Sequence, residues 1–316
     1  MPKSSPKNAY ILSDSYNKFL DKAVAVMLDR PTAKDTAFLA RQLVQATLPH
    51  SDPKTEKWAR RNGNFALGIQ AGFNPLTGET YGLPYGSIPR LLLFWITTEA
   101  IRTKTRRLEL GTSLAQFMRN VGLNPDTGGG KRGDAARLQE QMRRLINARI
   151  TFHEQDEQHE RRLNMEVAPD YELWWNPRQV KQDALWQSWI ELGEKFFQAI
   201  LAAPIPVDTR ALKALKRSPL ALDLYSLLCY ESYRVHKNGK PRFIAWRSLM
   251  EQLGAEYQAE NASWEFARYA RQALRKIQAV MPSLKLEIIE GGFTILDGST
   301  PPIPSRTAPE LKDMTK

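Results

Sequence analysis

Residues 111–150 read GTSLAQFMRNVGLNPDTGGGKRGDAARLQEQMRRLINARI, and this stretch decides the fold that the sequence predicts. Apolar side chains at helical spacing predict a compact helix that Thr112 or Ser113 caps and that ends before Gly122. A glycine-rich turn follows, and after it a longer helix is predicted over Asp134–Ala148, with Asp134 as its N-cap. The pattern is typical of two helices joined by a tight turn.

The flanking segments extend this pattern in both directions. Before it, IPRLLLFWITTEAIRT (88–103) predicts a buried helix with Pro89 in its first turn. After it, ITFHEQ (150–155) and RRLNMEVA (161–168) predict two strands around an acidic turn. The order helix, helix, turn, helix and hairpin is that of a winged helix, a helix-turn-helix with a β-wing.

The second half of the chain repeats this order at low sequence similarity. SPLALDLYSLLCYESYRV (218–235) and AWRSLMEQLG (245–254) predict the first two helices, Ser263–Ala279 the long third helix, and 284–298 the hairpin. We therefore expect an α+β fold, mainly α, with tandem winged-helix domains at 56–180 and 181–298. An N-terminal segment (1–55) is predicted to hold two helices, over 13–30 and 35–49, and a Pro-rich tail (299–316) is predicted to be disordered.

The charge of the chain points to a polyanionic partner. The formal net charge is +11, and residues 102–149 hold eleven Lys and Arg against four acids. Nucleic acid is the commonest partner of such a surface. No apolar run reaches membrane-spanning length, so we expect a soluble, cytoplasmic protein. The single cysteine, Cys229, lies in an apolar helical run and is interpreted as a core residue.

The two long predicted helices present similar outer faces. Opposite each apolar stripe lie mostly arginine, glutamine and asparagine, the donors that read guanine and adenine edges in the major groove. The alternative is two ordinary basic surface helices, but their matching positions in a repeat favour DNA recognition. The predicted DNA-binding residues on these helices are Arg137, Arg143, Arg144, Asn147, Arg268, Arg271, Gln272 and Arg275.

The glycine-rich turn has two interpretations. A nucleotide-binding P-loop needs glycine six residues before its lysine and Ser or Thr after it. Here Pro125 stands six residues before Lys131, and Arg132 follows it, so this motif fails. We predict a turn whose amides, with Lys131 and Arg132, contact DNA phosphates.

Evidence for catalysis in the sequence is weak. The turn FHEQDEQHE (152–160) brings His153 and His159 near several carboxylates, so a metal-dependent nuclease is an alternative. No third cluster supports it, and a solvated hairpin tip is favoured. We predict no metal, no cofactor and no enzymatic activity.

Several phrases resemble the RepA-type plasmid replication initiators of Gram-negative bacteria, close to the broad-host-range, IncW-like branch. They are LPYGSIPRLLLFWITTEAIRT (83–103), LGTSLAQFMRNVGL (110–123), ELGEKFFQAIL (191–201), PIPVDTRALKAL (204–215) and SPLALDLYSLLCY (218–230). The resemblance implies tandem winged helices that bind repeated origin sites (iterons) in double-stranded DNA, help to melt the origin and recruit host DnaA and the replicative helicase. It also implies dimers that repress their own promoter. A winged-helix transcriptional repressor without an initiator role is the alternative.

Self-association has a candidate surface at Leu83–Trp95, where an apolar helix follows a glycine-rich turn. Burial of these residues inside the first winged helix is the alternative explanation of the same pattern.

Overall fold

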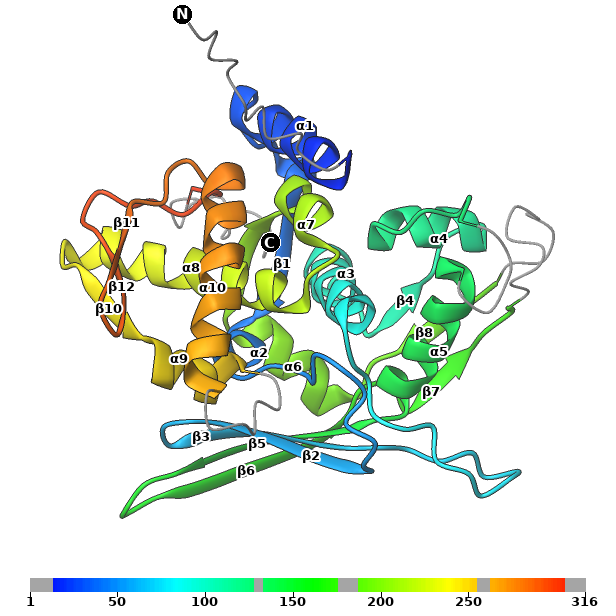
Figure 1. The fold of residues 1–316 in the computed structure, drawn as a ribbon. Coiled ribbons are helices and arrows are strands. Elements are labelled where there is room, and N and C mark those ends of the chain that lie inside the picture. The colour runs from blue at the N-terminus through cyan, green and yellow to red at the C-terminus, as the bar shows by residue number, and fades with distance from the viewer. Residues whose placement is uncertain (1–13, 128–132, 176–186, 255–261, 305–316) are drawn as a thin grey trace, which may run out of the picture.

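The structure is a computed structural model that describes residues 14–127, 133–175, 187–254 and 262–304. Its fold is mixed, with helices and strands interspersed along the chain (Figure 1). The N-terminal part consists of α1 (Asp14–Leu28), a 3-10 turn (Ala33–Asp35), β1 (Thr36–Ala40), α2 (Arg41–Gln45), β2 (Lys57–Asn62) and β3 (Phe65–Gln70).

The three helices and the hairpin predicted from residues 88–168 are present in the predicted order, with one additional short strand, β4 (Arg107–Glu109), between the first two helices. The elements are, in order, α3 (Ser87–Thr103), β4, α4 (Leu114–Val121), α5 (Asp134–Ile146), β5 (Arg149–Gln155) and β6 (Glu160–Glu166). The Ser113 hydroxyl accepts a hydrogen bond from the Gln116 amide, and Gly122 ends α4 in the left-handed region at φ +87°. These are the start and stop signals of the sequence.

The second half repeats the same order after a connection that spans residues 167–218. The connection holds β7 (Asp170–Glu172), β8 (Trp189–Glu191), α6 (Glu194–Ala202), β9 (Pro204–Asp208) and α7 (Thr209–Leu215). The repeat consists of α8 (Pro219–Asn238), β10 (Arg242–Ala245), α9 (Trp246–Leu253), α10 (Ala262–Val280), β11 (Leu286–Ile289) and β12 (Gly292–Ile295).

Strands β5 and β6 form the predicted hairpin, but the hairpin belongs to a larger sheet. The order of that sheet is β2-β3-β5-β6, all antiparallel, and it lies along the lower edge of the molecule in Figure 1. Leu67, Ile69, Ile150, Phe152 and Met165 alternate along its strands and are buried on one face. In the second half β12 lies between β10 and β11. The β11–β12 hairpin is therefore extended by one described strand, β10.

The helix predicted over residues 35–49 is wrong. Thr36–Ala40 form β1, and only Arg41–Gln45 are helical. Strand β1 pairs antiparallel with β9, with Ala37 opposite Val207 and Leu39 opposite Ile205. This long-range pairing buries Ala37, Leu39 and Ala40 and overrides the local helical pattern.

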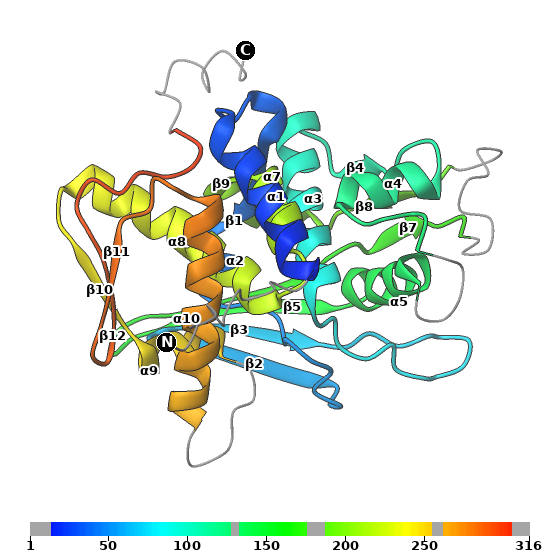
Figure 2. The same ribbon diagram turned by 45° about the horizontal axis from the view of Figure 1, so that its top comes forward.

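The two repeated halves are interlocked through their leading segments. Besides the β1–β9 pair, α1 packs against α7 and α10 of the second half. Figure 2 shows α1 crossing in front of α7. In the other direction, α6 packs on α3 and β6. The predicted boundaries near residues 55, 180 and 298 stay predictions. Of the predicted tail, residues 299–304 pack against the second half, where Ser299 and Ile303 are buried, and 305–316 lie outside the described residues.

A buried ionic network joins the first turn of α3 to α8. Arg90 is 3% exposed, and its Nε and Nη2 donate to the two oxygens of Asp223, each at 2.7 Å. Its remaining hydrogen bonds go to the carbonyls of Leu48, Pro49 and Gly86 and to the Thr47 hydroxyl. His50 Nε2 lies 2.9 Å from Asp223 Oδ2. The charges are therefore paired and hydrogen-bonded, as burial requires.

Residues Ile88–Trp95 are buried within the protomer. Internal packing, the alternative to the predicted self-association surface at Leu83–Trp95, therefore explains this apolar run. Cys229 is buried as predicted, and burial raises the pKa of its thiol far above the ordinary range. Among the described helices, none combines the length and the hydropathy needed to cross a membrane.

Removing one partner of the buried Arg90–Asp223 pair should destabilise the fold. We expect Asp223→Ala to lower the free energy of unfolding by about 3–5 kcal/mol, because it leaves the Arg90 charge buried without its partner. The matched control is Glu251→Ala, which breaks the exposed Arg247–Glu251 pair on α9 and should cost about 0.3–0.5 kcal/mol. Chemical denaturation measures both, and equal small losses would contradict the role assigned to the network.

Stability should also depend on pH through the same residues. Burial, with the Arg90 charge, lowers the pKa of His50 below its ordinary 6.5. The unfolded chain then binds a proton at His50 that the folded chain does not, so the free energy of unfolding should fall as pH drops below 6.5. Burial raises the pKa of Asp223, but the Arg90 charge and the His50 hydrogen bond outweigh this effect and hold it below 3.8. The contribution of the ionised Asp223 to the free energy of unfolding is therefore lost only when the pH falls below 3.8.

Denaturation curves measured from pH 8 down to pH 3 check this expectation. His50→Gln should flatten the first decline, whereas His236→Gln, at an exposed position of α8, should leave it unchanged. An undiminished decline in the His50 variant would refute the assignment.

Candidate nucleic-acid interface

Helix α5 has the buried stripe that the sequence predicts. Leu138, Met142, Leu145 and Ile146 are all buried, and the helix packs against α3 and α4. Its start differs by one residue from the prediction. Gly133 is the N-cap, and Asp134 is the first helical residue, where its negative charge favours the helix N-terminus.

The outer face of α5 exposes two of the predicted arginines. Arg137 and Arg143 are exposed, and Arg137 Nη1 lies 3.3 Å from Asp134 Oδ1. Asn147 is half-buried at the C-terminal end, where its Nδ2 donates to the Arg143 carbonyl at 2.9 Å. Arg137 and Arg143 are thus the predicted α5 residues that are most accessible to a nucleic acid.

Arg144 has several partners inside the protein. Its side chain is 15% exposed, and Nη2 donates to Glu140 Oε1 at 2.7 Å. Nη1 donates to the Leu83 carbonyl at 3.1 Å, and the guanidinium lies 5.1 Å from the centre of the Tyr85 ring. Contact of Arg144 with DNA stays a prediction, but these contacts favour a role in holding the 82–85 segment against α5.

Helix α10 exposes a face of arginine, glutamine and aromatic side chains. Arg268, Gln272 and Arg275 are exposed, opposite the buried stripe of Phe266, Ala270, Ala273, Leu274 and Ile277. The Arg268 guanidinium lies 4.8 Å from the Tyr269 ring centre and 5.7 Å from that of Trp264. Arg271 is half-buried over the Trp246 ring. The sequence pattern did not single out Tyr269, although its place outside the apolar stripe beside Arg268 is a usable signal.

The two helices lie in different parts of the molecule. In Figures 1 and 2, α10 and α5 stand on opposite sides of α3 and α7. The two basic faces are therefore separate surfaces. Two of the predicted phosphate contacts, Lys131 and Arg132, lie outside the described residues. The ends of their turn are fixed, since the Asp134 amide donates to Thr127 Oγ1 at 3.0 Å.

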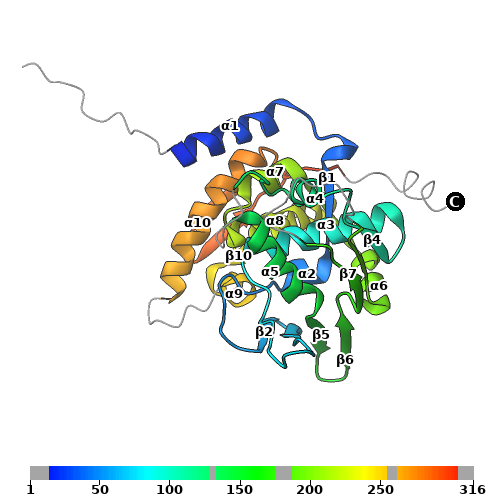
Figure 3. The same ribbon diagram turned by 90° about the vertical axis from the view of Figure 1, so that its right-hand side faces the viewer.

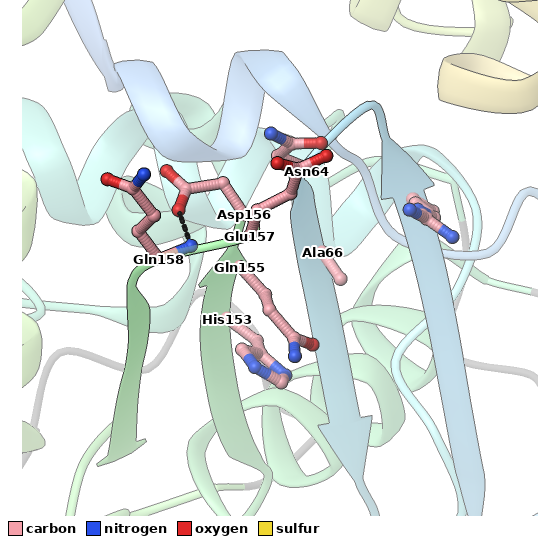
Figure 4. Close-up of a pocket in the computed structure, with 8 residues that line it drawn as sticks. Asn64, Ala66, His153, Gln155, Asp156, Glu157 and Gln158 are labelled. Atoms are coloured by element: carbon pink, nitrogen blue, oxygen red, sulfur yellow. Dashed lines mark hydrogen bonds between the residues drawn. The ribbon is translucent and has the colours of Figure 1, made fainter.

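The histidine-containing turn borders an open hollow of about 820 Å³. Its lining comes from β2, β3, β5 and the β2–β3 and β5–β6 turns, and Figure 4 shows Asn64, His153 and Gln155 among the lining residues. His153 Nε2 lies 3.1 Å from Glu160 Oε1, and Asp156 Oδ1 accepts from the backbone amides of Gln158 and His159. Within the described residues, no three His, Cys, Asp or Glu side chains come together as metal ligands would. The nuclease alternative therefore gains no support from the geometry.

Comparison with known proteins gives a family match. The model of the family "Plasmid encoded RepA protein" matches residues 83–248, more than half of the chain. A search of curated proteins finds no significant match. Among solved structures, the chain is similar to a crystal structure of RctB domains 2–3, with a TM-score of 0.48 and 13% identity, over 80% of this chain and 95% of that one. A selenomethionine derivative of RctB domains 2 and 3 matches at 12% identity with the same TM-score, over 80% of this chain and 94% of that one.

The matched residues run from the segment before α3 to the start of α9, and they include every phrase that carries the resemblance found in the sequence. The chain belongs to the family of plasmid-encoded RepA proteins.

Proposed function

We propose that this protein initiates plasmid replication by binding repeated sites in double-stranded origin DNA through α5 and α10. The observation that carries the proposal is the pair of long helices at the same position of two repeats, each with exposed arginines opposite a buried stripe. Family membership and the net charge of +11 support the same conclusion.

Each repeat is proposed to act as a winged helix. The order α3-β4-α4-α5-β5-β6 and the order α8-β10-α9-α10-β11-β12 both place a long helix third, directly before a hairpin. In a winged helix this third helix enters the major groove, and the preceding helix crosses the backbone. Helices α5 and α10 are the recognition helices under this assignment.

The exposed side chains on these helices suit base reading. Arginine can donate two hydrogen bonds to guanine O6 and N7, and glutamine can pair with adenine. Arg143 of α5 and Arg268, Gln272 and Arg275 of α10 are the proposed base-reading residues, while Lys131 and Arg132 are proposed to contact phosphates. Arg137 stands near the start of α5, where either role is open to it.

The remaining steps of initiation are proposed from the family. Binding at adjacent iterons would promote melting of nearby DNA and recruit host DnaA and the replicative helicase. Dimers would bind the promoter of the gene itself.

The first test is a mobility shift with DNA cloned from beside the gene, in the presence of random competitor DNA. We expect a ladder of shifted bands over tandem repeats. A single shifted band over one inverted repeat would indicate a repressor, and binding without sequence preference would refute base reading by α5 and α10.

Arg275→Ala should reduce specific binding by about 1–3 kcal/mol while leaving binding to random DNA nearly unchanged, because the lost contact is to a base edge. Arg30→Ala is the matched control, since Arg30 is an exposed arginine just after α1, on none of the helices assigned to DNA contact. Titration on specific and random DNA measures both variants, and equal losses on the two DNAs would reject the base contact.

Lys131→Ala should weaken binding to every sequence and reduce the slope of log K against log salt by about one, because one phosphate contact and its released counterion are lost. Affinities measured at several salt concentrations give this slope. An unchanged slope would remove Lys131 from the interface.

A further inference from the structure

The segment between β3 and α3 forms a small hairpin of its own. Phe73 and Thr80 pair as an antiparallel bridge, and the Asn74 amide donates to the Glu79 carbonyl at 2.8 Å. At the open end, the Tyr81 amide donates to the Gly72 carbonyl at 2.9 Å. Residues 72–82, here called the 72–82 hairpin, are thus a hydrogen-bonded projection.

The tip of the 72–82 hairpin is fixed by Asn74. Its side-chain oxygen accepts from the Leu76 amide at 3.0 Å, and its carbonyl accepts from the Gly78 amide at 2.7 Å. Gly78 has φ +74°, a conformation that glycine adopts without strain. The backbone around Pro75 and Leu76 is therefore held in one tight turn.

This ordered tip presents two large apolar side chains to solvent. Leu76 is 92% exposed and Phe73 is 63% exposed. A single exposed apolar residue is common on a soluble protein. Two such residues on one hydrogen-bonded projection, beside a proposed DNA-binding helix, indicate a surface that binds a partner.

The base of the 72–82 hairpin is fastened to the last turns of α5. A Cβ on Gly72 would lie 2.3 Å from the Asn147 carbonyl oxygen, and one on Gly82 would lie 2.8 Å from Arg144 Nη1. Arg144 also donates to the Leu83 carbonyl, and the Tyr85 amide donates to Gln141 Oε1 at 2.9 Å. The two glycines allow this close approach, so the position of the tip is tied to α5.

The 72–82 hairpin also projects on the outer side of α5. It extends past α5 at the right of Figures 1 and 2, and in the view from that side, Figure 3, it lies in front, just below α5. A duplex lying against the outer face of α5 would therefore meet the tip.

The β5–β6 turn is poorly suited to the role of a DNA-contacting wing. Glu154, Asp156, Glu157 and Glu160 lie at or beside it, and their charges repel phosphates. The tip of the 72–82 hairpin has one acid, Glu79, and otherwise neutral side chains.

We propose that the 72–82 hairpin is the DNA-contacting wing of the first repeat and acts as a wedge, inserting Leu76, with Phe73 behind it, between bases beside the α5 site. Apolar wedges of this kind unstack a base step from the minor groove and kink the duplex. The inference rests on the proposed binding of DNA by α5, and it adds a way in which binding distorts the DNA. Arg144 is then a positioning residue that holds the wedge to the recognition helix.

The test uses the full chain and the flanking DNA that shifts in the binding assay, with 2-aminopurine placed at successive positions of the protected region. This base analogue becomes more fluorescent when it is unstacked. The wild-type protein should raise the fluorescence at one step beside the α5 site. Leu76→Ala should lose most of this increase while still binding the DNA, and Arg144→Ala should lower it by releasing the hairpin.

The matched control is Leu28→Ala, because Leu28 is also strongly exposed and belongs to α1, a helix that lies apart from α5 in Figure 3. It should leave the increase unchanged. Equal fluorescence with wild-type protein and Leu76→Ala, both bound, would overturn the wedge and leave the proposed function intact. The wedge is also overturned if Leu76→Ala leaves DNA unstacking intact but abolishes association with a protein, such as a second copy of this chain. Failure of the wild-type protein to bind any flanking DNA would overturn both the wedge and the proposed function.

Discussion

The buried guanidinium of Arg90 is the interaction on which the arrangement of the two repeats depends. A charge at this depth is tolerated only when every donor has a partner. The partners come from two distant segments, the loop after α2 and Asp223 on α8, and from Gly86, the N-cap of α3 itself. Because Arg90 bonds to all of these partners at once, the first turn of α3 is held next to the N-terminal part of α8. Because α5 packs on α3 and α10 packs on α8, the two proposed recognition helices are fixed with them.

The exchange of leading segments reinforces this arrangement. Within the part of the chain that the structure describes, strand β1 pairs with β9 of the other half in a two-stranded sheet. Helix α1 covers α7 and α10, and α6 covers α3. Separation of the halves would expose two strand edges and several apolar faces, which is costly in water. Under the proposed function, two basic faces held in a fixed arrangement suit a long DNA site that has two segments at a set spacing.

Helix α5 illustrates how one surface can combine two roles. Arg137 and Arg143 point away from the protein, whereas Arg144, one residue further, is taken up by Glu140, Asp52 and the Leu83 carbonyl. At 100° per residue, adjacent side chains diverge far enough for one to face solvent and the next to face a neighbouring segment. Arg144, which the sequence grouped with the other predicted DNA-binding residues, donates to the Leu83 carbonyl directly after the 72–82 hairpin.

The sequence by itself determined the local elements and the family. Apolar periodicity located α3, α4, α5, α8 and α10, because a helix that buries one stripe records its period in the chain. Ser113 and Gly122 marked the ends of α4, since capping acts within a few residues. The buried stripe and exposed arginines of each long helix were predictable for the same reason.

Only the tertiary structure decided what depends on contacts between distant residues. The sequence of β1 predicts a helix, but its pairing with β9 outweighs local propensity. The β5–β6 hairpin joins β2 and β3 in one sheet because β5 pairs with the distant strand β3. Asp223, the partner of Arg90, and the Leu83 carbonyl, a partner of Arg144, lie far away in the chain, so no spacing rule could reveal them. Local periodicity records which face of an element is buried, but it holds no information about what that face is buried against.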